Sequence, residues 1–184
     1  IEAMLSACSV YKGYCFPMIG LHPTSVNANY EKELEIVARE LKFSKEYVAI
    51  GEIGMDLYWD KTYLKEQQIV LDKQVNWALE YDLPIVIHCR DAFDYIYKVL
   101  EPYKKTPLRG IFHSFTGTAE EATRVLEFSD FFIGINGVVT FKKSHLPEIL
   151  AGIPLGKIVL ETDSPYLTPV PNRGKRNESA YVKD

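Results

Sequence analysis

Side chains that can bind a metal ion or move a proton follow nearly every apolar run of this sequence. His22 comes just after one such run, Glu52 after the next and His88 after a third. His113 and Asp163 follow two later runs. Imidazole and carboxylate groups together suit a divalent ion such as Zn, Mn or Co, which polarises an electrophile and lowers the pKa of bound water to about 7. Hydrolysis is the chemistry that this set predicts.

Each of these residues has a simpler interpretation when it is taken alone. A single His at a strand end is usually structural, and a Glu after a strand is usually a helix cap or a solvated charge. Five placements at the same end of successive strands favour a metal site over caps. Cys89 adjoins His88, but successive strand residues point to opposite faces, so we expect Cys89 to pack. Glu161 precedes Asp163 by two residues, so it either shares a face with Asp163 or holds a neighbouring group.

The apolar runs have the spacing of βα units. The expected strands are Tyr14 to Gly20, Val48 to Gly51, Pro84 to His88, Gly110 to His113, Phe131 to Gly134 and Lys157 to Leu160. Residues with helical periodicity lie between them, as in Leu34 to Leu41, Leu71 to Leu79 and Ala119 to Leu126, and the chain opens on what reads as a helix, Ile1 to Tyr11. Consecutive apolar residues such as 85–87 indicate strands that are covered on both faces, as in parallel sheets. The spacing allows either an open doubly wound sheet or most of a TIM barrel, in which all the strand ends meet at one rim.

The composition is that of an ordinary globular protein. The 184 residues are 47% hydrophobic and 25% charged, with a net charge of −4, so we expect a single domain over residues 1–184 and no global positive field that attracts nucleic acid. A polyanion would have to be held by local cations or by metal. The three cysteines show no Cys-x-x-Cys spacing, which favours a reducing compartment, and we expect a cytoplasmic protein. No apolar run approaches the roughly 18 residues of a membrane span, so no contact with a membrane is expected.

Six motifs at the strand ends resemble those of the TatD family of metal-dependent deoxyribonucleases. They are Gly-Leu-His-Pro at 20–23, Gly-Glu-Ile-Gly-Met-Asp at 51–56, Ile-His-Cys-Arg-Asp-Ala at 87–92, His-Ser-Phe-Thr-Gly at 113–117, Glu-Thr-Asp-Ser-Pro-Tyr-Leu at 161–167 and Pro-Asn-Arg-Gly-Lys-Arg-Asn at 171–177. The resemblance implies a TIM (β/α)8 barrel of the amidohydrolase type with two divalent ions, which could be Zn, Mn, Mg or Co. It implies that Glu52 bridges both ions, that His88 and His113 hold one, and that Asp163 binds the other.

The resemblance also implies an activity, namely hydrolysis of phosphodiester bonds in DNA from the 3′ end. Glu52 and Asp163 would be the catalytic carboxylates, and DNA with single-stranded ends would be the substrate, with no obligate protein partner. His22 is the candidate for substrate contact at the metal site. Arg90, Arg173 and Lys175 are candidates for phosphate contact, although a basic loop such as 173–176 is as readily a solvated one.

One motif of the family is absent from this sequence. The family begins with a strand that carries His-x-His, whose histidines complete the Asp163-side ion, and no such motif occurs here. We therefore expect a barrel that is incomplete at the N-terminus, where its first two strands are lacking, and at the C-terminus. Two other functions stay open: a related hydrolase acting on a small ester or amide, and an inactive truncated barrel that serves as a binding scaffold.

Overall fold

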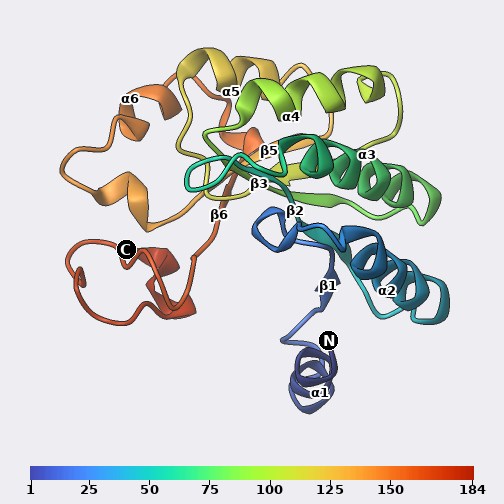
Figure 1. Ribbon diagram of the computed structural model, residues 1–184. Helices are drawn as coiled ribbons and strands as arrows, with labels where there is room; N and C mark the ends of the chain where they lie inside the picture. Colours follow the sequence, from blue (N-terminus) through green and yellow to red (C-terminus); the bar gives the residue numbers. More distant parts are fainter. The chain divides into compact units, whose positions relative to one another are not determined.

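The structure, a computed structural model, describes all of residues 1–184 and divides into two compact units. The first unit is Ile1–Gly110 and the second is Ile111–Asp184. Each unit is an assembly of parallel strands and the helices between them, and each is described by itself below (Figure 1).

Three parallel strands form the core of the first unit. They are β1 (Met18–Ile19), β2 (Ala49–Asp56) and β3 (Ile85–Arg90). β2 pairs with β1 on one side and with β3 on the other. Ile53 of β2 and Ile87 of β3 lie opposite each other and are fully buried. Parallel strands that are covered on both faces are built from such apolar runs, as the sequence predicts.

Four helices accompany these strands, and the two longest appear in blue and green in Figure 1. The helices are α1 (Glu2–Val10), α2 (Tyr30–Phe43), α3 (Leu64–Glu80) and α4 (Phe93–Leu100). α3 packs against β2, and α4 packs against β2 and β3. The predicted apolar face of α2 is buried through Leu34, Val37 and Leu41, whereas α1 buries none of its residues.

The second unit contains two paired parallel strands. Its elements are β4 (Gly110–Phe112, which begins at the boundary between the units), α5 (Ala119–Val125), β5 (Phe131–Ile135), α6 (Leu146–Leu150) and β6 (Ile158–Leu160). β5 pairs with β6, and α5 packs against β5. A capping box between Thr118 and Glu121 starts α5, because each side chain accepts a hydrogen bond from the other residue's backbone N–H. Short 3₁₀ turns lie at Pro23–Ser25, Glu101–Tyr103, Gly137–Thr140, Leu155–Lys157 and Ser179–Lys183.

All six predicted strands are confirmed, and two of them differ from the expected bounds by more than two residues at one end. The first begins only at Met18, because Tyr14 and Phe16 are exposed and have no sheet to pack on. The second runs on to Asp56, five residues beyond its expected end at Gly51. None of the helices combines the length and apolar character that crossing a bilayer requires. A single domain over residues 1–184 stays a prediction.

Candidate metal centre

The sequence had suggested that Glu52 lies at the end of its strand. In the structure Glu52 lies inside β2. Ile50 pairs with Ile85 and Ile53 with Ile87, so β2 holds one residue more than β3 between these pairs. Such a bulge re-aims a side chain and is common beside active sites. Gly54, two residues after Glu52, has φ +135°, and a Cβ there would lie 2.0 Å from the backbone oxygen of His88. The glycine therefore permits close approach of two strands instead of ending one.

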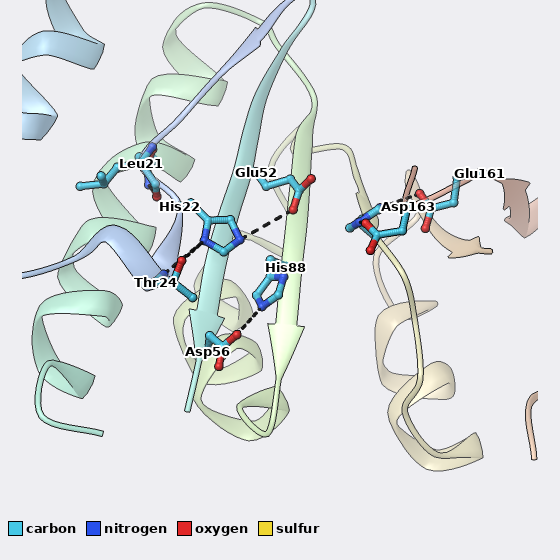
Figure 2. Close-up of polar contacts among 10 residues, drawn as sticks. Leu21, His22, Thr24, Glu52, Asp56, His88, Glu161 and Asp163 are labelled. Carbon is cyan, nitrogen blue, oxygen red and sulfur yellow. Dashed lines mark hydrogen bonds and ion pairs between the residues drawn. The ribbon is translucent and has the colours of Figure 1, made fainter. Parts of the chain in front are cut away.

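Three side chains of the first unit form a group that could hold a metal ion. One ligand atom from each of His22, Glu52 and His88 lies within 4.8 Å of the others. The rings of His22 and His88 are 4.7 Å apart between centroids, and His22 Nε2 lies 3.8 Å from Glu52 Oε2. Figure 2 shows the three side chains turned toward one another from neighbouring elements. Imidazole and carboxylate groups are the donors that a borderline divalent ion prefers, so the chemistry of this group fits such an ion.

The contacts of His22 affect what it offers to this group. Its Nδ1 accepts a hydrogen bond from the backbone N–H of Thr24 at 3.2 Å and lies 2.7 Å from the Thr24 hydroxyl. In a neutral ring whose Nδ1 accepts, the proton sits on Nε2, the nitrogen that faces Glu52. In this tautomer His22 supplies a hydrogen-bond donor and no lone pair, so Glu52 and His88 are the two members of the group that can ligate an ion. That suits the predicted substrate contact by His22, which stays a prediction.

Asp56 is a residue of this site to which the sequence assigned no role. Its Oδ2 lies 2.9 Å from Nε2 of His88, and the residue is only 6% exposed. Gln67 holds the Asp56 backbone at both its N–H and its carbonyl. A carboxylate on one ring nitrogen fixes the tautomer and the orientation of a metal-binding histidine. In the sequence Asp56 stands only as the last residue of the motif at 51–56, and its partner His88 lies 32 residues further along the chain.

A second group lies in the second unit around His113, directly after β4. Its Nδ1 lies 2.8 Å from Glu161 Oε2, and its Nε2 lies 3.3 Å from Asp163 Oδ1. Glu161 Oε1 also accepts the backbone N–H of Ser114 at 2.5 Å. Ligand atoms that are about 2.0–2.1 Å from a tetrahedral Zn ion lie about 3.3 Å from each other. The spacing of His113 Nε2 and Asp163 Oδ1 therefore fits two ligands of one ion.

The four predicted ligands thus fall into two pairs. Glu52 and His88 lie together in the first unit, and His113 and Asp163 lie together in the second. The contact between His113 and Asp163 joins two residues that the resemblance had assigned to different ions. The sharing of one ion by Glu52, His88 and His113 remains a prediction. Figure 2 shows Asp163 beside Glu161. Glu161 contacts both the ring of His113 and the backbone N–H of Ser114, so it holds a neighbouring group, which is one of the two roles that the sequence left open.

The predicted phosphate-contacting cations are all exposed. Arg90, the last residue of β3, lies with its guanidinium carbon 3.7 Å from the centroid of the Tyr58 ring. Arg173 lies in the same way over Phe141, also at 3.7 Å. Lys175 belongs to the same loop as Arg173, and its carbonyl accepts a hydrogen bond from Thr168. Arg90 therefore lies in the unit of Glu52 and His88, and the two loop cations lie in the unit of His113.

Comparison with solved structures identifies the class of fold. The crystal structure of YJJV, a TatD homologue from Escherichia coli, matches 99% of this chain with a TM-score of 0.82 and 28% sequence identity, and 71% of that chain is covered. A TatD family hydrolase from Entamoeba histolytica matches 91% of the chain with a TM-score of 0.71 and 25% identity, and 57% of that chain is covered. TatD structures have the TIM-barrel fold, so the predicted α/β-barrel class is confirmed.

The family follows from sequence as well. The family model for TatD related DNase matches residues 1–184, so the chain belongs to the TatD family of metal-dependent hydrolases. The uncharacterized metal-dependent hydrolase YabD of Bacillus subtilis is 40% identical over 171 residues, which are 92% of this chain and 66% of YabD. A Pantoea ananatis protein named 3′-5′ ssDNA/RNA exonuclease TatD is 33% identical, and the match covers 94% of this chain and 68% of that protein. The chain therefore spans about two thirds of the length of these relatives.

Proposed function

We propose that the protein hydrolyses phosphodiester bonds of nucleic acid, acting from the 3′ end of single-stranded DNA. The observation that carries this proposal is the pairing of imidazole and carboxylate at both candidate groups, Glu52 with His88 and His113 with Asp163. Membership of the TatD family supports it, as does the exonuclease name of the relative from Pantoea ananatis. The cytoplasm is the proposed location, and the three cysteines, which form no disulfide bond, agree with it.

Glu52, His88, His113 and Asp163 are the residues that would hold two divalent ions. Such ions, when bound, polarise a phosphoryl oxygen and lower the pKa of water. The chain's own residues would do the rest. Asp163 would accept the proton of the attacking water, and the Nε2–H of His22 would donate a hydrogen bond to a phosphate oxygen.

Local cations would hold the rest of the polyanion, since the chain as a whole carries a net charge of −4. Arg90, Arg173 and Lys175 are the candidates, because guanidinium and ammonium groups bind phosphate oxygens through charge-assisted hydrogen bonds. Contacts of this kind are independent of base sequence. We expect the affinity for single-stranded DNA to fall steeply as salt is raised.

The test is metal-dependent digestion of 3′-labelled single-stranded DNA by the purified protein. A chelator should abolish cleavage, and Mn, Mg, Zn or Co should restore it. His88→Ala should lower the rate by about 100-fold or more. His145→Ala is the matched control, because His145 is exposed and pairs only with the exposed Glu148 at 3.6 Å, outside both groups.

Three results would contradict the proposal, and each points elsewhere. Cleavage that survives chelation would exclude the metal mechanism. Metal-restored turnover of lactones or small amides with none of DNA would indicate a related hydrolase. Firm metal binding with no turnover of any of these substrates would indicate a binding scaffold.

A further inference from the structure

Two aromatic side chains stand in solvent just beyond the C-terminal end of β2. Tyr58 is 49% exposed and Trp59 is 81% exposed, directly after the buried Leu57. Their rings meet edge to face, with centroids 4.6 Å apart and planes at 89°. Neither ring is needed to fill the core of the first unit. Large exposed aromatics of this kind are typical of binding surfaces.

The backbone beneath the two rings is held in place on both sides. The Oδ1 of Asp56 accepts the backbone N–H of Tyr58 at 3.1 Å. The N–H of Leu57 donates to the carbonyl of Arg90 at 2.9 Å. The rings are therefore presented from an anchored turn, so a ligand that binds them orders little of the chain and loses little affinity to that ordering.

A cation adjoins the aromatic pair. The guanidinium carbon of Arg90 lies 3.7 Å from the Tyr58 ring centroid, and Arg90 is exposed. A guanidinium that stacks on a ring keeps its N–H groups in the plane, where they can reach phosphate oxygens. We call Tyr58, Trp59 and Arg90 the aromatic cluster. It offers an apolar ring face and a phosphate-binding cation side by side, which are the two features that a nucleotide requires.

The aromatic cluster adjoins the candidate metal group of the same unit. Asp56 connects them, because its Oδ1 holds Tyr58 while its Oδ2 lies 2.9 Å from Nε2 of His88. Figure 2 shows Asp56 and His88 below Glu52 on the neighbouring strands β2 and β3. A nucleotide bound to the aromatic cluster would thus be the neighbour, along the nucleic acid, of the nucleotide whose phosphate lies at Glu52 and His88.

The surroundings limit what the aromatic cluster can bind. The next residues, Asp60, Lys61 and Thr62, are all polar and exposed. The apolar area is therefore confined to two rings, which matches one or two bases and falls short of the contiguous patch that a stable protein partner buries. We propose that Tyr58, Trp59 and Arg90 form a stacking site for an unpaired base of a single-stranded nucleic acid, a proposal that rests on the function proposed above.

Binding measured in the presence of a chelator tests this without any cleavage. The probes are a fluorescein-labelled DNA decamer and a decamer of abasic sites, which has the same phosphates and no bases. Trp59→Ala should weaken binding of the normal decamer by about 5- to 150-fold, the range that base stacking supports. It should leave binding of the abasic decamer unchanged, and Trp59→Phe should restore most of the affinity.

Phe43→Ala is the matched control. Phe43 is 78% exposed and is the last residue of α2, the helix that leads back to the start of β2. It therefore lies at the opposite end of the strands from Trp59, and its loss should not change the affinity for either probe. Because both aromatic side chains are exposed, neither substitution should unfold the protein.

The outcomes separate this inference from the proposed function. A loss of affinity in Trp59→Ala that is equal for both decamers, or no loss at all, would overturn the stacking site even if the protein digests DNA. A loss confined to the base-bearing decamer would support it even if no cleavage is ever found. Wild-type protein that binds both decamers equally would also overturn it.

Discussion

Replacement of Glu161 by Gln should lower the metal affinity at His113 while leaving the shape of the site intact. Glu161 Oε2 lies 2.8 Å from Nδ1 of His113, and its Oε1 accepts the N–H of Ser114 at 2.5 Å. A carboxylate can only accept, so a neutral His113 carries its proton on Nδ1. That leaves the lone pair on Nε2, which lies 3.3 Å from Asp163 Oδ1. Such a lone pair is what a metal ion requires.

The amide of Gln reverses this arrangement. The N–H of Ser114 can only donate, so the Gln oxygen stays on Ser114 and the NH₂ group meets Nδ1 of His113. Nδ1 must then accept, and the proton moves to Nε2, where it can donate to Asp163 instead of leaving a lone pair for the ion. Loss of an orienting partner costs about 10- to 100-fold in metal affinity, or about 1.4 to 2.7 kcal/mol. We expect Glu161→Gln near the upper end of this range.

Two measurements check the prediction. Competition with a chromophoric chelator gives the affinity for Zn or Mn, and ¹⁵N shifts of the His113 ring in metal-free protein identify which nitrogen carries the proton. Glu148→Gln is the control, because Glu148 also lies near a histidine ring, at 3.6 Å from His145, but is exposed and outside the site. An affinity in Glu161→Gln within about twofold of the wild type would refute the reasoning, whatever the ring shifts show.

A substitution at Gly134 tests the position of the same Glu161 carboxylate. A Cβ at Gly134 would lie 2.8 to 2.9 Å from the three terminal atoms of the Glu161 side chain. Gly134→Ala should therefore displace the carboxylate from His113 and weaken metal binding without changing any ionisable group. If Gly134→Ala kept its full metal affinity while Glu161→Gln lost it, the position of the Glu161 carboxylate would not matter. Its negative charge alone would then support metal binding.

Three further predictions concern the metal, a strand and the pH dependence of stability. His113→Ala should lose bound metal in elemental analysis, and a folded variant with full metal content would exclude His113 as a ligand. Gly54→Ala should lower the free energy of unfolding in urea by between about 2 and 5 kcal/mol, because its Cβ would meet the backbone oxygen of His88 at a strained φ, and an unchanged midpoint would contradict this close approach. Burial and the hydrogen bond to Glu40 raise the pKa of Tyr47 to about 12. The Tyr47 hydroxyl thus adds stability that is full below about pH 10 and is lost as the pH rises toward 12, and Tyr47→Phe should flatten the fall of the unfolding free energy over that range.

The strands and the residues beside them could be predicted because their signals are local. Runs of four to seven mostly apolar residues predicted all six strands, and the positions of His113 and Glu161 directly after β4 and β6 followed from the same runs. Glu52 was misplaced because Gly51 is typical of a strand end, whereas here Gly51 and Gly54 let β2 approach β3. Close approach between two strands is a property of the pair, and a single strand's sequence does not contain it.

The hydrogen-bond partners of the two histidines show a common plan that no local signal reveals. Asp56 and His88 are 32 residues apart, and Glu161 and His113 are 48 apart. In each unit one carboxylate oxygen holds a histidine ring and the other holds a backbone N–H, that of Tyr58 or of Ser114. A carboxylate anchored in this way has lost its rotational freedom before any ligand arrives, so the histidine that it holds is orientated in advance. Because the Asp56 carboxylate also holds the backbone N–H of Tyr58, we expect a shift of His88 in the first unit to affect the turn that carries Tyr58 and Trp59, which are part of the surface that we propose for base stacking.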